Sequence, residues 1–540
     1  MSLDPKAATT LTEVIRRRAA LTPRAQYFSL FDEVVTYERL WSMSARYAAG
    51  LAAAGIGPGD KVCLIYPTCA EFFYTFLGAL RLGAVPVPLY PTLGVEATAN
   101  IFRDCEAVAV ATIGWFRHGV DASVALAPNV RMVLEPNELD HDGAAPPEAV
   151  ARPEDLCFLQ YTSGSTGHPR GVMLTHANVV ETTKFMAEGA GITAEDRVVS
   201  WLPLYHDMGL IGCAFTPPLT ATPIWLLPPD LRNPRPWLET ITKIRATFTV
   251  SPDFGYRNCV RNVRDTSEFD LSSLKSALSG AEPVRTSTIE AFESHFGIKR
   301  VISPCYGLAE ATLAVAIWPR GVPLRTDTSG RWLSVGQPCR GVSVRIAEPL
   351  RDDGPRETVV LPVDTEGEVC VKSPGVMKGY YNNPDATARV LDADGWLRTG
   401  DLGFVDDEGF LYITGRLKDL IILGGRNLLP ADVEEAVDQL AAVRYSAAVG
   451  IDSERTGSQR LYVVVETRDP AAPPDGGWAT LARDVVQRVQ RAVGHRPSRV
   501  LLVTPSTIPK TSSGKIQRAR LGEMIRAGEL RDRAVGADAH

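Results

Sequence analysis

A loop rich in hydroxyl groups and glycine is the segment of this chain with the clearest chemical potential. Residues 161–171 read Y-T-S-G-S-T-G-H-P-R-G, with four serine or threonine residues and three glycines in eleven positions. The apolar residues 156–160 just before it predict a short buried strand. A strand that leads into such a loop offers backbone N–H groups and hydroxyl dipoles to an anion. The loop is therefore a candidate polyphosphate site, and a plain surface turn is the alternative on composition alone.

Four further segments place charged or aromatic residues in short motifs. Each motif has an ordinary alternative: a tyrosine in the core or at its rim, an aspartate in a turn, or a lysine on a solvated loop. Their order and spacing along the chain are therefore more informative than any one of them. The four are Y-G-L-A-E at 306–310, T-G-D at 399–401, G-R-L-K-D at 415–419 and P-K-T-S-S-G-K at 509–515.

The elements that must position these motifs alternate between strands and helices. Residues 62–66 predict a strand, residues 71–82 a helix with several apolar side chains, and residues 84–89 a second strand. A βαβ unit of this kind favours a parallel sheet with right-handed crossovers. Similar alternation continues to about residue 320, so we expect an α/β fold.

The pattern of predicted strands and helices changes twice after residue 320. Short strands and tight turns from Val335 onward predict a β-rich subdomain. Beyond residues 416–418 we expect a small α+β unit. We predict a large N-terminal domain over 1–416, its β-rich subdomain at about 335–416, a C-terminal domain over 417–530 and a tail over 531–540. The small domain's predicted elements are strands 420–423, 445–450, 460–466 and 499–503 and helices 431–441 and 478–493.

Composition narrows the class of protein. A chain of 540 residues exceeds what one hydrophobic core usually supports, so more than one domain is expected. The net charge of −6 argues against a nucleic-acid-binding protein. Nine dispersed cysteines without a C-x-x-C pair favour reduced thiols and a cytoplasmic location. We expect no transmembrane segment, because no uninterrupted apolar run reaches 18 residues.

Taken together, the five motifs resemble the adenylate-forming superfamily, which contains acyl-CoA synthetases, fatty acyl-AMP ligases, peptide-synthetase adenylation domains and luciferases. The resemblance covers about residues 10–525. It implies that a carboxylate attacks the α-phosphorus of ATP, releasing pyrophosphate and leaving an acyl-adenylate. Charge then builds on phosphoryl oxygens, so fixed cations and N–H donors aimed there are expected to do most of the catalytic work.

The resemblance also implies roles for individual residues. The family usually has lysine where this chain has Arg170, which keeps the charge and can contact two oxygens. The implied catalytic residues are Lys515, Glu310 and His206, with Mg²⁺ at Glu310 and Thr166 and a hinge at Lys418. For His206, a structural role capping a helix is the alternative. The implied ATP- and AMP-binding residues are Thr162, Ser163, Gly164, Ser165, Thr166, Gly167, Arg170, Gly280, Ala281, Glu282, Tyr306, Gly307, Asp401 and Arg416.

The branch of the superfamily is less sharply indicated. The segment S-W-L-P-L-Y-H-D-M-G-L at 200–210 resembles fatty acyl-AMP ligases, which implies a fatty acid substrate and a carrier-protein phosphopantetheine as acceptor. The short stretch 317–333 leaves little room for that branch's insertion, which favours free CoA instead. A catalytically dead acyl- or nucleotide-binding module is the alternative of another class. Candidate residues for an acyl tunnel are Trp201, Phe215, Phe248 and Phe254.

Overall fold

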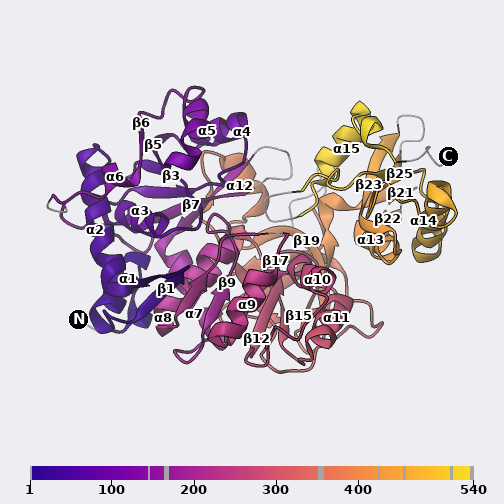
Figure 1. Ribbon diagram of the computed structural model, residues 1–540, viewed down its shortest axis with the longest axis horizontal. Helices are drawn as coiled ribbons and strands as arrows, with labels where there is room; N and C mark the ends of the chain where they lie inside the picture. Colours follow the sequence, from indigo (N-terminus) through magenta and orange to yellow (C-terminus); the bar gives the residue numbers. More distant parts are fainter. Residues whose placement is uncertain are drawn as a thin grey trace.

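The computed structural model describes most of the chain (Figure 1). The described residues are 3–143, 146–162, 169–230, 232–350, 358–423, 426–453, 458–510 and 515–535. Five of the expected nucleotide-binding residues therefore lie outside the described part: Ser163, Gly164, Ser165, Thr166 and Gly167.

The predicted βαβ unit is present near the N-terminus. Strands β3 (Lys61–Ile65) and β4 (Val85–Pro88) pair in parallel, and helix α3 (Ala70–Arg81) connects them. Phenylalanines on α3 are almost completely buried, which anchors the helix on the sheet. Strands β5 (Ala107–Thr112) and β6 (Met132–Leu134) complete a four-stranded sheet with the order β4-β3-β5-β6.

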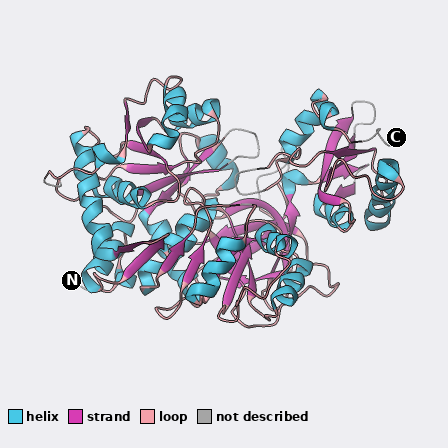
Figure 2. Ribbon diagram, in the orientation of Figure 1, coloured by secondary structure: helices cyan, strands magenta, loops and turns pink. Residues whose placement is uncertain are grey.

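A 13-stranded sheet forms the centre of the molecule, with helices packed against it (Figure 2). Three neighbouring strands, β11 (Phe248–Pro252), β12 (Ser276–Gly280) and β13 (Ile302–Gly307), run parallel. Parallel strands end at the same edge of a sheet, and ligands bind there in open α/β sheets. The residues that follow β12 and end β13 are Ala281-Glu282 and Tyr306-Gly307, so the fold brings two sets of expected nucleotide-binding residues together.

The β-rich strands continue the same 13-stranded sheet beyond β13. Strand β14 (Ala314–Ile317) pairs antiparallel with β13 and leads into the β-rich part. Strands β19 and β20 bring the T-G-D and G-R-L-K-D motifs into adjacent positions, because Asp401 lies opposite Arg416 in the ladder. The β-rich strands are β15 (Ser334–Pro338), β16 (Ser343–Ala347), β17 (Gly367–Lys372), β19 (Leu397–Val405) and β20 (Leu411–Arg416).

A separate three-stranded sheet carries the ends of the hydroxyl-rich loop. Strands β7 (Leu156–Thr162) and β8 (Arg170–Thr175) pair antiparallel, and Thr162 lies opposite Arg170. Strand β18 (Gly379–Tyr380) pairs with the other edge of β8. The predicted buried strand before the loop is thus present.

Residues beyond 416 form their own α+β unit, which lies at the right-hand end of the molecule in Figure 1. The predicted strand 499–503 matches β25, whereas β23 and β24 are longer than predicted and pair over their full length. Helix α13 ends earlier than predicted, in a turn where the N–H of Leu440 donates to Val437 O. The elements are β21 (Ile421–Leu423), β22 (Arg426–Leu428), α13 (Pro430–Asp438), β23 (Val443–Ser453), β24 (Ser458–Thr467), α14 (Gly477–Val493), β25 (Arg499–Val503) and α15 (Arg518–Ala527).

The remaining elements cover the sheets or connect their strands. Thr10 caps α1 by accepting a hydrogen bond from the N–H of Glu13. These elements are η1 (Pro5–Ala7), α1 (Leu11–Leu21), β1 (Gln26–Leu30), β2 (Glu33–Thr36), α2 (Tyr37–Ala53), α4 (Val95–Asp104), α5 (Gly114–Val124), α6 (Pro136–Leu139), α7 (His176–Gly189), β9 (Val198–Ser200), η2 (Met208–Phe215), α8 (Pro217–Thr220), β10 (Ile224–Leu226), α9 (Arg235–Ile244), α10 (Asp253–Asn262), α11 (Thr286–Phe296), η3 (Ala309–Ala311), α12 (Pro384–Val390), η4 (Leu417–Asp419) and η5 (Arg531–Arg533).

Hydrophobic cores divide the chain into two lobes. Two core clusters draw their buried residues from Ala8 to Leu411, and two others draw theirs from Ile421 to Leu530. We call residues 3–416 the large lobe and residues 417–535 the small lobe. The predicted α/β fold, with a parallel sheet, β-rich strands and a small C-terminal unit, is confirmed. Among the described residues, no helix combines the length and apolar character that a membrane crossing requires.

Candidate active site

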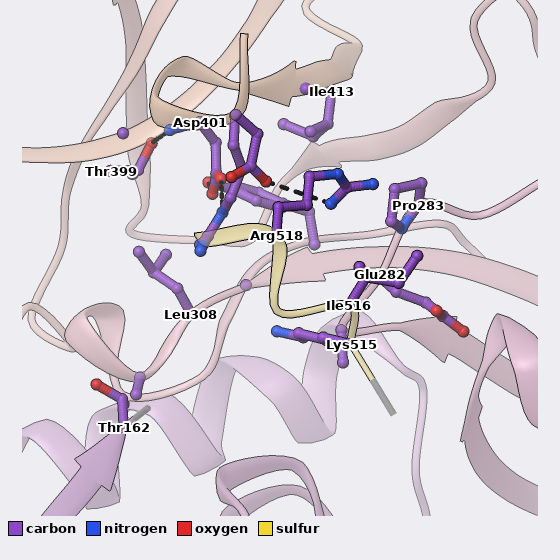
Figure 3. A pocket seen from close by; sticks show the side chains of 18 of the residues that line it. Thr162, Glu282, Pro283, Leu308, Thr399, Asp401, Ile413, Lys515, Ile516 and Arg518 are labelled. Carbon is purple, nitrogen blue, oxygen red and sulfur yellow. Dashed lines mark hydrogen bonds and ion pairs between the residues drawn. The ribbon is translucent and has the colours of Figure 1, made fainter. Parts of the chain in front are cut away.

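A large cavity lies between the two lobes. Its volume is about 2150 Å³, and residues of both lobes line it. All five motifs contribute described residues to this lining: Thr162, Arg170, Tyr306, Asp401 and Arg416 from the large lobe and Lys515 from the small lobe. Figure 3 shows part of this lining, with Thr162 of the loop's leading strand, Asp401 and Lys515 bordering the same space.

Two side chains hold the carboxylate of Asp401 at the cavity wall. Its Oδ1 accepts a 2.7 Å hydrogen bond from Arg416 Nε, and its Oδ2 accepts one of 2.7 Å from the Tyr306 hydroxyl. Burial and the neighbouring Asp401 charge raise the pKa of Tyr306, which therefore stays a protonated donor. Each carboxylate oxygen retains a further lone pair. Asp401 can thus still accept hydrogen bonds from the vicinal hydroxyls of a ribose.

Glu310 and Arg170 are connected through one tyrosine. The Tyr380 hydroxyl donates a 2.8 Å hydrogen bond to Glu310 Oε1, and the Arg170 guanidinium lies 5.2 Å from the centre of the Tyr380 ring. This arrangement keeps a cation and a carboxylate on the same wall, where a polyphosphate and its counter-ion could both be held. Sequence reasoning missed Tyr380. The link spans 70 residues of chain, and a tyrosine after glycine carries no motif of its own.

His206 lies at the start of an unusual helix. The π-helix η2 begins just after it, and Asp207 caps this helix by accepting a hydrogen bond from the N–H of Met208 at 2.7 Å. Asp207 Oδ1 is also 2.7 Å from His206 Nδ1. Burial by itself raises the pKa of Asp207, but the interaction with His206, the charge of Lys515 and the hydrogen bond from the Met208 N–H together hold the pKa below its usual value. π-helices occur frequently at functional sites.

Lys515 reaches into this cavity from the small lobe (Figure 3). The Lys515 side chain is open to the cavity, but protein atoms surround it and partly remove the water around its ammonium group. This burial lowers the pKa of Lys515, and the charge of Arg416 lowers it further. Carboxylates of Asp207, Asp401 and Glu282 oppose that shift. The ammonium therefore sits among groups of both lobes, close to where a nucleotide held by Asp401 would lie.

The segment 280–282 follows β12 in a constrained conformation. Ala281 has φ of 65°, a region that residues other than glycine seldom adopt. A Cβ at Gly280 would lie 2.6 Å from Cys305 Sγ, so this position requires glycine. Ala281 and Glu282 line the cavity, and Gly280 packs behind them. Glu282 Oε1 accepts the Phe254 N–H at 2.6 Å, so its carboxylate fixes the turn after β11.

The apolar part of the cavity extends along β11, β12 and β14. Phe248 and Phe254 line it, as the sequence suggests, whereas Trp201 and Phe215 are packed in the core. Trp201 packs against Trp237, and Phe215 against Phe76, so these two tunnel assignments are wrong. Sequence reasoning missed several lining residues, because an apolar residue or a glycine looks the same in the sequence whether it faces a core or a cavity: Met186, Ile192, Gly212, Leu278, Leu313 and Ile317.

Comparisons with known proteins agree with this geometry. The family model "AMP-binding enzyme" matches residues 15–381, and "AMP-binding enzyme C-terminal domain" matches 432–515. A putative acyl-CoA synthetase of Caulobacter vibrioides is 34% identical over 97% of this chain and 96% of its own length. The long-chain-fatty-acid–AMP ligase FadD26 of Mycobacterium marinum is 31% identical over 97% and 98%.

A solved structure from work on fatty acyl-adenylate ligases of E. coli and L. pneumophila superposes with a TM-score of 0.86. It is 28% identical and covers 97% of this chain and 99% of its own. The chain belongs to the AMP-binding enzyme family. It is an acyl-adenylate-forming ligase that uses ATP, so the family and the enzyme class predicted from the five motifs are confirmed.

Proposed function

We propose that this enzyme activates a medium- or long-chain fatty acid with ATP and then passes the acyl group to a phosphopantetheine thiol. The observation that carries the proposal is the single cavity, which joins charged groups of both lobes to an apolar extension between strands. A fatty acid needs a concave apolar surface for its chain and a polar end where its carboxylate meets the nucleotide. Relatives named as long-chain-fatty-acid–AMP ligases support this substrate class.

The cavity residues then divide the work of adenylate formation. Asp401, braced by Arg416 and Tyr306, would hold the ribose hydroxyls. Arg170 would contact the β- and γ-phosphates beside the loop. The Lys515 ammonium would offset negative charge at the α-phosphate as the carboxylate attacks and pyrophosphate leaves. His206 at the start of η2 would steer the substrate carboxylate towards that centre.

A magnesium ion fits this set of residues. Mg²⁺ usually binds proteins through one or two carboxylates and completes its shell with water and substrate phosphates. Glu310 uses one oxygen for Tyr380 and keeps the other, next to the wall that carries Arg170. When bound, the ion would neutralise charge on the triphosphate. The described residues contain no cluster of three metal-ligating side chains, which suits an ion carried mainly by the nucleotide.

We assign different tasks to the two lobes. The large lobe would hold the acid and the nucleotide, and the small lobe would supply Lys515 and later turn away to admit the thiol. Lys418 is the proposed hinge, because it lies between the last strand of the large lobe and the first strand of the small one. The separate cores on either side of it are consistent with such a rotation.

A carrier protein is the favoured acceptor, supported by the 200–210 segment and by the relatives named as AMP ligases. Free CoA is the second candidate, because a relative carries the name acyl-CoA synthetase.

The test is to incubate purified enzyme with ATP, Mg²⁺ and acids of increasing length. Products with CoA and with a holo-carrier protein are then compared by mass spectrometry. Acyl-AMP formation from fatty acids supports the proposal, and its absence with every acid would refute it.

A further inference from the structure

Helix α13 forms ion pairs both with the large lobe and with the segment that follows Lys515. Three acidic residues of this helix each pair with an arginine from another part of the chain. Two of the arginines belong to the large lobe and the third begins α15 in the small lobe. The pairs are Asp432 with Arg331 at 2.6 Å, Asp438 with Arg285 at 3.4 Å, and Glu434 with Arg518 at 2.7 Å.

The Arg285 pair is the less exposed of the two that cross between lobes. The side chains of Arg285 and Asp438 are 24% and 12% exposed, so water screens their attraction less than it does on an open surface. The backbone N–H of Arg285 donates to Asp253 Oδ1 at 3.1 Å, which fixes the base of the side chain. Burial alone lowers the pKa of Arg285, but the charges of Asp438 and Asp253 raise it above its usual value.

The third pair connects α13 to the Lys515 segment. Nη2 of Arg518 donates to both carboxylate oxygens of Glu434, at 2.7 Å each, and such charge-assisted hydrogen bonds are among the stronger ones in proteins. Glu434 is buried and also accepts the N–H of Ala448 at 2.9 Å, so it cannot move independently of the small lobe. Arg518 lies three residues after Lys515. A shift of α13 therefore carries the Lys515 segment with it.

We propose that Arg285, Asp438, Arg331 and Asp432 are positioning residues for adenylate formation. They dock α13 on the large lobe, and through Glu434 and Arg518 they hold Lys515 in the nucleotide cavity. None of the four needs to contact the reacting atoms. The proposal rests on the proposed role of Lys515. Because rotation of the small lobe breaks both cross-lobe pairs, they favour adenylate formation over the transfer step.

The first experiment removes the negative charges of Asp432 and Asp438 but keeps side chains of nearly the same shape. Asp438→Asn keeps an oxygen that can accept the Ser446 hydroxyl, which is 2.8 Å from Oδ1 in the native protein. We expect Asp432→Asn/Asp438→Asn to lower the single-turnover rate of acyl-AMP formation about tenfold, equivalent to a modest loss of binding free energy. The KM for ATP and the rate at which preformed acyl-AMP reacts with thiol should change less than about twofold. Asp484→Asn, an exposed residue on α14, is the matched control and should behave as wild type.

Exchanging the charges of the Arg331–Asp432 pair distinguishes a positioning role from a general loss of structure. Arg331→Asp and Asp432→Arg should each slow acyl-AMP formation, and the two together should restore it, because opposite charges then face each other again. Equal loss in both half-reactions, unaltered rates in every variant, or failure of a well-folded double exchange to recover would each overturn the proposal. Lys515→Ala in parallel tests the underlying function. If it leaves acyl-AMP formation intact, the lysine's role fails. If it abolishes formation while the Asp432/Asp438 variant is unaffected, only the positioning role fails.

Discussion

Tyr306 and Asp401 are 95 residues apart in the chain, yet their side chains share a 2.7 Å hydrogen bond at the wall of the cavity. The first ends a parallel strand of the large sheet and the second lies on an antiparallel strand of its β-rich part. The bond therefore ties together the two sections of the sheet at the point where a nucleotide would bind. It also leaves the Asp401 carboxylate oriented before any ligand arrives.

Replacing Asp401 by alanine should weaken nucleotide binding. The substitution removes an ionised acceptor for two hydroxyl groups, and hydrogen bonds to charged groups contribute about 1.5–3 kcal/mol. We expect the dissociation constant for ATP to rise roughly 10- to 100-fold, measured by calorimetry. Tyr306→Phe is the matched control. It should weaken binding by a smaller factor, since the carboxylate remains. An unchanged affinity for Asp401→Ala would refute the ribose assignment.

Replacing Lys515 by alanine should abolish acyl-AMP formation with little effect on ATP affinity. Its ammonium is expected to act on charge that develops in the transition state, and loss of one such group typically reduces the rate about 10²- to 10³-fold. Single-turnover formation of acyl-AMP and equilibrium binding of ATP measure the two quantities separately. A large rise in the ATP dissociation constant with normal turnover would contradict this role.

The pH profile should carry the signature of Lys515. Burial and Arg416 place its pKa below the ordinary lysine value, and the proposed role requires the charged form. The kcat/KM for adenylate formation should therefore fall as the pH rises through a value lower than 10.5. In Lys515→Arg, any residual activity should lose this alkaline limb because arginine stays protonated. An alkaline limb that persists unchanged in the arginine variant would assign it to another group.

Gly212 is the position at which acyl chain length can be tested. A Cβ added there would lie 3.2 Å from Leu313 Cδ2 and 3.6 Å from Met186 Cε, both on the cavity wall. Gly212→Leu should exclude about four methylene groups, worth about 0.8 kcal/mol each, and so lower kcat/KM for long acids roughly 200-fold. Short acids should be little affected, and Gly212→Ala should give an intermediate result. A uniform loss across all chain lengths would mean that Gly212 lies away from the acyl chain.

Stability at acid pH should depend on His176. This residue is buried at the start of α7 and its Nδ1 accepts the N–H of Leu11 at 3.2 Å. Burial lowers the pKa of His176 to about 4, although the nearby Asp155 charge opposes the shift. The unfolded chain then binds the proton more tightly, so the free energy of unfolding falls as the pH drops from 6.5 towards 4, by about 3 kcal/mol from this residue. Denaturant unfolding of wild type and His176→Gln should show a smaller decline in the variant over that range.

Much of the site could be predicted because its residues belong to short motifs of consecutive residues. Tyr306 lies at the end of a parallel strand, and Asp401 and Arg416 face each other on the antiparallel strands β19 and β20. The strand before the hydroxyl-rich loop and the βαβ unit were equally accessible, since their apolar patterns are local. Helix α13 shows the limit of such patterns: its apolar positions continue past Asp438, but a turn ends it.

What could not be predicted depends on contacts between distant segments. Tyr380 reaches Glu310, and Arg285 reaches Asp438, only after the sheet and the small lobe have assembled. The two misplaced tunnel residues have the same origin. Phe215 and Phe248 are similar in the sequence, and only packing decides that the first contacts other rings while the second faces the cavity.

The position of Arg416 has a mechanical consequence. It ends β20, within the large sheet, and the short helix η4 that leads to the small lobe starts at the next residue. A rotation of the small lobe about Lys418 would therefore act directly on Arg416, whose side chain donates a hydrogen bond to the Asp401 carboxylate. If the small lobe turns about Lys418 as proposed, the same turn would therefore alter the contact that holds the proposed ribose acceptor.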